Sequence, residues 1–159
     1  MFTIAIGSDH RGVHIKGRLI QALVAAGYTV LDEGTDSVQS VDYPDFAHHV
    51  AKRVSNGDAD RGILICGTGI GMSITANKFD GVRAASCYDE VMVEMSRRHN
   101  DVNVLCLPGD MIGDRPVDEL VLMWLQTEFD GGRHEVRVKK IAEMEKLAQR
   151  NSSAPLENQ

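Results

Sequence analysis

One glycine-rich stretch, GILICGTGIGMSITANK (residues 62–78), has the composition of a site that binds an anion. Gly67, Gly69 and Gly71, at a spacing of two, allow successive backbone N–H groups to point toward one place at the start of a helix. Such amides and the helix dipole stabilise a negative charge. The stretch matches neither the GxxxxGK[ST] phosphate loop nor the GxGxxG dinucleotide motif. By itself it therefore indicates an anion or oxyanion and no particular reaction.

Cys66 comes directly before this loop and has two interpretations. A free cysteine is most often a small, buried, apolar residue. Amide donors and a helix start beside it would instead favour the thiolate, which is the reactive form. Position alone does not decide between them. No polar motif at Cys87 or Cys106 argues for another role, so we expect both to be buried and inert.

Other polar residues follow apolar runs or end a loop. His10 follows Asp9 in GSDHRG, His99 precedes Asn100 in SRRHNDVN, and Tyr43 ends a long loop. Taken singly, His10 and His99 are each better explained as surface or helix-capping residues. Four further histidines lack such positions, and we expect them to be surface or packing residues: His14, His48, His49 and His134.

Arg133 and Arg137 stand four residues apart, so on a helix they share one face. Two guanidinium groups on one face can clamp a phosphate, although the spacing alone favours a solvated basic face. Histidines and cysteines are scattered without an HExxH or paired-cysteine pattern, so we expect no metal site. A GxSxG nucleophile motif is also absent from the sequence.

Short apolar runs alternate with segments of helical spacing, which is the pattern of an α/β fold. The runs are Phe2–Ile6, Tyr28–Leu31, Gly62–Cys66, Arg83–Cys87 and Asn103–Leu107. Because they are apolar throughout, we expect strands that are buried on both faces of a parallel sheet. The sequence thus predicts a Rossmann-like three-layer sandwich with a five-stranded parallel sheet. Ligands of such folds bind at the carboxyl ends of the strands, where the polar loops described above begin.

Helices are expected between the strands. Leu19, Ile20, Leu23 and Val24 fall on one face of the first, and Pro44 suits the first turn of the second. Further helices are expected at residues 69–78, 89–98 and 116–129.

The C-terminal part is different. From Arg133 onward a charged segment carries Val138, Ile141, Met144 and Leu147 at a spacing of three. This predicts a long helix with a narrow apolar stripe, which packs on its own domain or on a partner chain. We expect a single domain over residues 1–149 and a polar, disordered tail over residues 150–159.

The composition excludes several classes of partner. A net charge of −6 over 159 residues argues against nucleic acid or an anionic membrane as the main partner. No apolar window is long enough to span a bilayer. Three unpaired cysteines suggest a reducing compartment, so we expect a cytoplasmic protein.

Five motifs, in this order, resemble those of the B-type ribose-5-phosphate isomerases: GSDHRG, DYPDFA, GILICGTGIGMSITANK, SRRHNDVNVL and GGRHEVRV. That family also includes allose-6-phosphate isomerases and the subunits of galactose-6-phosphate isomerase. The resemblance covers about residues 3–148. It implies a Rossmann-like fold, an aldose–ketose isomerase that needs no cofactor, and a homodimer or homotetramer whose active sites are shared between chains.

The resemblance also implies roles for individual residues. A cysteine at the position of Cys66 is the base that removes the C2 proton, whereas a second subgroup uses a glutamate within the glycine loop. Here that region reads Gly71-Met72-Ser73, which places the chain with the cysteine type. His99, with Thr68, would assist opening of the furanose ring. The enediolate would be stabilised by the amides of Gly67, Thr68, Gly69, Ile70 and Gly71, with Ser73 in support. Asp9 and Tyr43 would contact sugar hydroxyl groups, and Asn100 would position the substrate. The phosphate would be bound by His10, Arg133 and Arg137. The segments of His99–Asn100 and Arg133–Arg137 would come from the partner chain, with the C-terminal helix in the interface.

One residue departs from the pattern. In LCLPGDMIG, Asp110 stands where members of the family often carry an arginine close to the phosphate. A carboxylate there would weaken phosphate binding or point elsewhere. Three functions therefore remain open: isomerisation of ribose 5-phosphate, isomerisation of a six-carbon phosphosugar such as allose 6-phosphate with residues 34–41 as the length sensor, and a non-catalytic phosphosugar-binding module.

Overall fold

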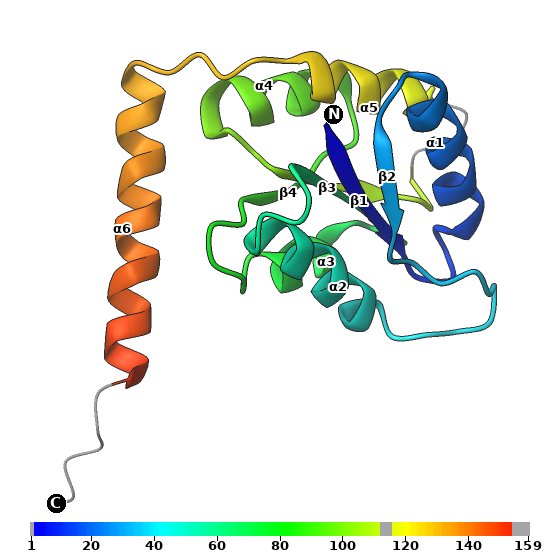
Figure 1. Ribbon diagram of the computed structural model, residues 1–159, viewed down its shortest axis with the longest axis horizontal. Coiled ribbons are helices and arrows are strands. Elements are labelled where there is room, and N and C mark those ends of the chain that lie inside the picture. Colours follow the sequence, from blue (N-terminus) through cyan, green and yellow to red (C-terminus); the bar gives the residue numbers. More distant parts are fainter. Residues whose placement is uncertain (1, 112–115, 154–159) are drawn as a thin grey trace, which may run out of the picture.

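The computed structural model describes residues 2–111 and 116–153, in which strands and helices alternate along the chain (Figure 1). The strands are β1 (Thr3–Ser8), β2 (Thr29–Asp32), β3 (Arg61–Cys66), β4 (Ala84–Ser86) and β5 (Val104–Pro108). The helices are α1 (Val13–Ala25), α2 (Tyr43–Ser55), α3 (Ile70–Ala76), α4 (Glu90–Asn100), α5 (Val117–Gln126) and α6 (Arg133–Ser153).

All five strands pair in parallel, in the order β2-β1-β3-β5-β4. The central strands β1, β3 and β5 are almost wholly buried, whereas β2 and β4, at the two edges, are only partly buried. The prediction of strands buried on both faces is therefore confirmed for the centre of the sheet. It is wrong for β2 and β4, because an edge strand has a neighbour on one side only.

Helices α1, α4 and α5 cover one face of the sheet, and α2 and α3 cover the other (Figure 1). Alternate residues of a strand point to opposite faces. Ile63 and Ile65 accordingly join the core beneath α1, α4 and α5, whereas Leu64 and Cys66 join the core beneath α2 and α3. This three-layer α/β arrangement confirms the predicted fold class.

The buried face of α1 is narrower than predicted. Leu19 and Leu23 are buried, but Val24 is 58% exposed. A helix turns by about 100° per residue, so Val24 lies too far round from Leu23 to reach the sheet.

Arg61, the first residue of β3, fastens that strand to the end of α5. Its Nη1 donates hydrogen bonds to the carbonyl oxygens of Trp124 and Leu125 at 3.1 and 2.9 Å. The guanidinium group also lies over the rings of Phe2 and Trp124. Burial lowers the pKa of Arg61 to about 10, which leaves the side chain charged at neutral pH.

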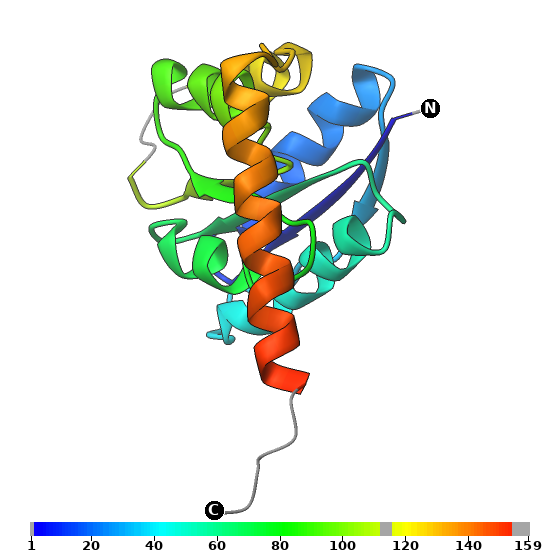
Figure 2. The same cartoon turned by 90° about the vertical axis from the view of Figure 1, so that its left-hand side faces the viewer.

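Helix α6 lies along the edge of the domain at β4 and extends past it (Figures 1 and 2). Glu145 accepts a hydrogen bond from the Gly81 amide at 3.0 Å, while Ile141, Met144 and Leu147 are exposed. The predicted helix is thus present, and its apolar stripe stays mostly uncovered by its own chain. The helix runs to Ser153 and so includes the first residues of the predicted tail; residues 154–159 lie outside the described part of the chain. The boundary at residue 149 stays a prediction. None of the helices described is long and apolar enough to cross a membrane.

Replacing Arg61 tests how strongly the end of α5 depends on it. We expect Arg61→Met to lower the free energy of unfolding by about 2–4 kcal/mol, because two buried carbonyl groups lose their donor. Urea unfolding followed by circular dichroism measures the change. Arg18→Met is the matched control: its exposed pair with Asp118 predicts a change of about 0.5 kcal/mol or less. Equal losses in both variants would contradict the assignment.

Candidate active site

Cys66 ends β3 with its sulfur on the buried side of the sheet that faces α3. The side chain is 5% exposed, and the Gly69 amide donates a hydrogen bond to Sγ at 3.2 Å. Gly69 can turn its amide this way because it adopts φ 72°, a left-handed conformation that favours glycine. A side chain at Gly69 would also collide with the hydroxyl of Ser86. The sulfur therefore receives an N–H donor from a loop that is fixed in shape.

The other two thiols have different surroundings. The Cys87 thiol lies against the carbonyl oxygens of Ala85 and Met92, and burial raises its pKa to about 11. Burial also raises the pKa of Cys106, which has no exposed surface. The prediction that both are buried is confirmed. Among the three cysteines of the described structure, Cys66 alone accepts a hydrogen bond from a backbone amide at its sulfur.

The amides that follow Cys66 lie at the start of α3. The Ile70 amide donates to the Thr68 hydroxyl at 3.3 Å, and the Thr68 carbonyl oxygen accepts from Ser86 at 3.1 Å. The first N–H groups of a helix have no backbone acceptor within it. In α3 the Ile70 amide uses the Thr68 hydroxyl, which leaves the next amide, that of Gly71, to face an anion. Ser73 lies one turn further on, where its hydroxyl donates to the Ala84 carbonyl oxygen at 3.1 Å. It therefore fastens α3 to β4, which supports the loop from behind.

Tyr43 and Gly71 form one side of this loop. Tyr43 is the first residue of α2, and its ring lies so close to Gly71 that an added Cβ would overlap it. The Tyr43 side chain is partly exposed, at 39%. Its hydroxyl therefore stands beside the start of α3, where it can reach a ligand bound to the amides.

Asp9 and His10 follow β1, next to the end of β3. Asp9 is 5% exposed, and its amide donates to the Ile65 carbonyl oxygen at 3.1 Å. His10 Nδ1 accepts a hydrogen bond from the Val41 amide at 3.3 Å. In a neutral His10 this places the proton on Nε2, the nitrogen that remains to donate to a ligand.

Residues 33–42 lie over this edge and are held by a buried lysine that the sequence patterns did not single out. Lys16 is 2% exposed, and its Nζ binds Asp32 at 2.6 Å and Asp36 at 3.1 Å. Gly34 packs directly on the Lys16 stem and leaves no room for a Cβ. A lysine among the polar residues of α1 gives no sequence signal of this role, because its partners lie on another segment.

Asp110 lies over Gly67 and is paired. Its carboxylate contacts Arg11 Nε at 2.5 Å, and its amide donates to the Gly67 carbonyl oxygen at 3.1 Å. The neighbouring Gly109 amide donates to the Cys66 carbonyl oxygen at 2.8 Å. The charge of Asp110 is thus paired with the Arg11 guanidinium group beside the loop. The sequence did not predict this pairing.

The thiol cluster consists of Asp9, His10, Tyr43, Cys66 and the loop of residues 67–71. It occupies the carboxyl edge of the sheet, as predicted for a Rossmann-like fold.

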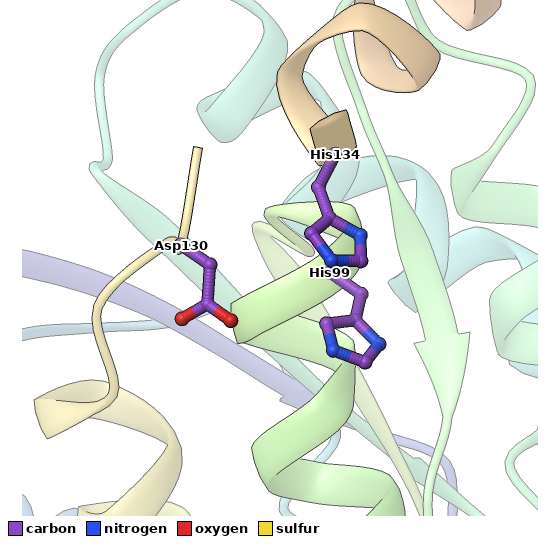
Figure 3. Close-up of side chains that lie close together, drawn as sticks. All are labelled: His99, Asp130 and His134. Carbon is purple, nitrogen blue, oxygen red and sulfur yellow. The ribbon is translucent and has the colours of Figure 1, made fainter. Parts of the chain in front are cut away.

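A second group, the histidine–arginine cluster, consists of His99, Asn100, Arg133, His134 and Arg137. His99 and Asn100 end α4, and the other three lie in the first turns of α6. The rings of His99 and His134 stack with their centroids 4.1 Å apart and their planes within 3° (Figure 3). Arg133 Nε donates to His134 Nε2 at 3.2 Å. His134 was expected to be a surface or packing residue, and it packs here against His99.

The two clusters lie at opposite ends of the strands: the thiol cluster lies where the strands end, and the histidine–arginine cluster lies where they begin. Val104, which begins β5 shortly after His99, pairs with Gly62 at the start of β3, whereas Cys66 ends β3. Four residues of strand separate these ends by about 13 Å. One chain therefore does not bring Cys66 and His99 together, although it contains both.

His99, Asp130 and His134 could in principle offer three ligand atoms to a metal, since these atoms lie within 4.8 Å of one another. Their geometry argues against a shared ion. The lone pairs of stacked imidazoles lie in parallel planes and do not converge, and the Asp130 carboxylate accepts from Arg98 at 3.1 and 3.3 Å. That hydrogen bond lowers the pKa of Asp130, as expected for a carboxylate committed to a guanidinium partner.

A family model and similar proteins all point to one family of sugar phosphate isomerases. The family model described as Ribose/Galactose Isomerase matches residues 4–141. A putative sugar phosphate isomerase of Bacillus subtilis is 47% identical over 89% of this chain and 96% of its own length. The ribose-5-phosphate isomerase B of Escherichia coli is 44% identical over 91% of this chain and 97% of its own.

A solved structure agrees. Ribose-5-phosphate isomerase B of Clostridium thermocellum is 50% identical, covers 92% of this chain and 99% of its own, and superposes with a TM-score of 0.89. The matched region contains both the thiol cluster and the histidine–arginine cluster. The chain therefore belongs to the ribose/galactose isomerase family.

Proposed function

We propose that the protein interconverts D-ribose 5-phosphate and D-ribulose 5-phosphate through ring opening and a cis-enediolate, with Cys66 as the base. The observation that carries this proposal is the Cys66 sulfur held by the Gly69 amide at the start of an amide-lined loop. A thiolate and an oxyanion pocket in one place are what abstraction of a proton next to a carbonyl requires.

Ring opening comes first, because furanose ribose has no carbonyl group to acidify C2. One proton leaves the O1 hydroxyl and one is delivered to the ring oxygen as the bond from C1 to that oxygen breaks. His99, with Thr68 across the site, performs this exchange. Ribulose 5-phosphate is acyclic because its O5 carries the phosphate, so only the aldose needs this step.

Proton transfer then converts the open aldose into the ketose. Cys66 takes the C2 proton, the electron pair moves to form the C1–C2 double bond, and negative charge develops on O1. The amides of residues 67–71 stabilise that oxygen, which supplies about 3–4 kcal/mol for each well-placed donor. The Cys66 thiol then returns a proton to C1 while the O2 proton passes to O1, so that C2 becomes the carbonyl carbon and O1 a hydroxyl group, which completes the isomerisation. None of these steps needs a cofactor.

The remaining residues hold the substrate. Asp9 and Tyr43 contact sugar hydroxyl groups, and Asn100 positions the sugar from the other cluster. His10 donates from Nε2 to the phosphate, and Arg133 and Arg137 clamp it. Because one chain keeps the two clusters at opposite edges of the sheet, a complete site takes one cluster from each of two chains in a homodimer or homotetramer. The exposed apolar residues of α6 then become part of the contact between chains.

A six-carbon phosphosugar is the second candidate, and the loop of residues 33–42 bears on it. Lys16 fastens this loop through Asp32 and Asp36, and the Val41 amide at its far end donates to His10. A loop held in this way favours the shorter sugar. A phosphosugar-binding module without catalysis remains the non-enzyme alternative, but it would have no use for a polarised thiol.

Turnover of D-ribose 5-phosphate beside D-allose 6-phosphate tests the substrate and the base together. We expect turnover of the pentose, and we expect Cys66→Ala to lower kcat by about 1,000-fold or more, because it removes the group proposed to take the C2 proton. Formation of the ketose is followed by absorbance. Cys106→Ala is the matched control, since it removes a thiol from the same core and should keep kcat.

A clear preference for allose 6-phosphate would replace the proposed substrate and leave the mechanism intact. Near-normal turnover by Cys66→Ala would show that the assigned base is wrong. Binding of phosphosugars without turnover of any would favour the binding module.

Mixed oligomers test whether the sites are shared. Cys66→Ala and His99→Asn should each be nearly inactive, but co-expression in equal amounts should restore about a quarter of wild-type activity. Half of the dimers would then be mixed, and each mixed dimer would have one intact site of two. Activity of the mixture that equals the mean of the two single variants would mean that each chain forms its own site.

Gly71→Ala tests the place of Tyr43. A methyl group at this position must displace the Tyr43 ring, so we expect KM for the phosphosugar to rise by about fivefold or more. The matched control is Gly17→Ala on α1, where a Cβ meets nothing within 4 Å. If the two variants had the same KM, Tyr43 would not contact the sugar.

A further inference from the structure

His134 makes two contacts that the proposed reaction has not yet used. Its ring lies flat against His99 (Figure 3). Its Nε2 also accepts a hydrogen bond from Arg133 Nε at 3.2 Å. It is also 9% exposed, the lowest exposure in the cluster. One buried side chain thus contacts both the ring-opening residue and one arginine of the phosphate clamp.

The contact with Arg133 fixes the protonation of His134. A nitrogen that accepts a hydrogen bond carries no proton, so Nε2 is bare and the single proton of the ring is on Nδ1. Burial lowers the pKa of His134, and the neighbouring His99, Arg133 and Arg137 lower it further, opposed by Asp130. The remaining charged neighbour, Arg98, is bound to Asp130 and Glu94. His134 is therefore a neutral ring at neutral pH.

A neutral ring stacked on His99 suits a residue that must gain and lose a proton. The flat contact restricts rotation of the His99 ring without using either of its nitrogens. The π face of His134 also attracts the imidazolium form of His99, in the manner of other cation–π pairs. A second charged ring in the same place would repel that form.

We propose that His134 is a positioning residue with two separable effects: its ring holds His99 for ring opening, and its Nε2 holds Arg133 for phosphate binding. This inference rests on the proposed isomerase reaction. It assigns no proton transfer to His134 itself, whose bare nitrogen is already occupied by Arg133.

Two substitutions separate the effects. His134→Phe keeps an aromatic face of similar size against His99 but offers no acceptor to Arg133. We expect KM for ribose 5-phosphate to rise by about fivefold or more while kcat stays within about twofold. His134→Gln places a carbonyl oxygen near the position of Nε2 but removes the ring. Here we expect kcat to fall by about tenfold or more with little change in KM. His14→Phe and His14→Gln, at an exposed position on α1, are the matched controls and should change neither constant.

Binding of inorganic phosphate, measured by calorimetry, tests the contact with Arg133 without any need for turnover. His134→Phe should weaken it by about fivefold and His134→Gln should not. A wild-type protein that binds phosphate but fails to isomerise ribose 5-phosphate would overturn the proposed function and leave this phosphate prediction standing. The inference itself is overturned if the two variants change kcat and KM in the same proportion, if both behave as the wild type, or if both lose thermal stability and activity in parallel.

Discussion

A parallel sheet sends all its strands in one direction, and every other feature of this protein depends on that geometry. The residues that follow strands gather at the carboxyl edge, so Cys66, Asp9 and the amide loop meet there. The helices return in the opposite direction, so the end of α4 and the start of α6 gather at the other edge. The length of a strand then separates the thiol from His99. The proposal that two chains share each site rests on this direction of the strands, because the proposed reaction would need both residues.

The three cysteines show how local geometry gives one residue type different chemistry. All three are buried in the described structure. Cys87 lies against carbonyl oxygens, which accept a hydrogen bond from the thiol, and Cys106 is surrounded by apolar side chains. Cys66 instead faces an amide donor, which a sulfur that has lost its proton accepts better than a thiol does. Burial alone therefore does not distinguish the three cysteines. The orientation of the Gly69 amide is what distinguishes Cys66 from the other two.

The sequence predicted the order of strands and helices and the residues of the thiol cluster, because apolar runs and the glycine loop are local signals. Asp9 and the glycine loop lie at the carboxyl ends of the strands as predicted, because they follow directly after buried runs. The same expectation was wrong for His99 and Asn100, which end a helix and lie where the strands begin. The sequence could not reveal His134 or Lys16, whose partners lie far along the chain, nor the pairing of Asp110 with Arg11 across 99 positions. Val24 was misplaced because its apolar character says nothing of the angle at which α1 meets the sheet. The spacing of apolar residues predicts which face of a helix is buried, whereas contacts between segments distant in the sequence become visible only in the folded structure.

Helix α6 carries its apolar residues outward while its first turn carries Arg133 and His134. The element that would join two chains is therefore continuous with the element proposed to hold the phosphate. If the sites are shared as proposed, specific activity would depend on protein concentration and would fall on dilution as the subunits separate. Dilution series would thus report the strength of assembly through a rate, without any physical separation of species.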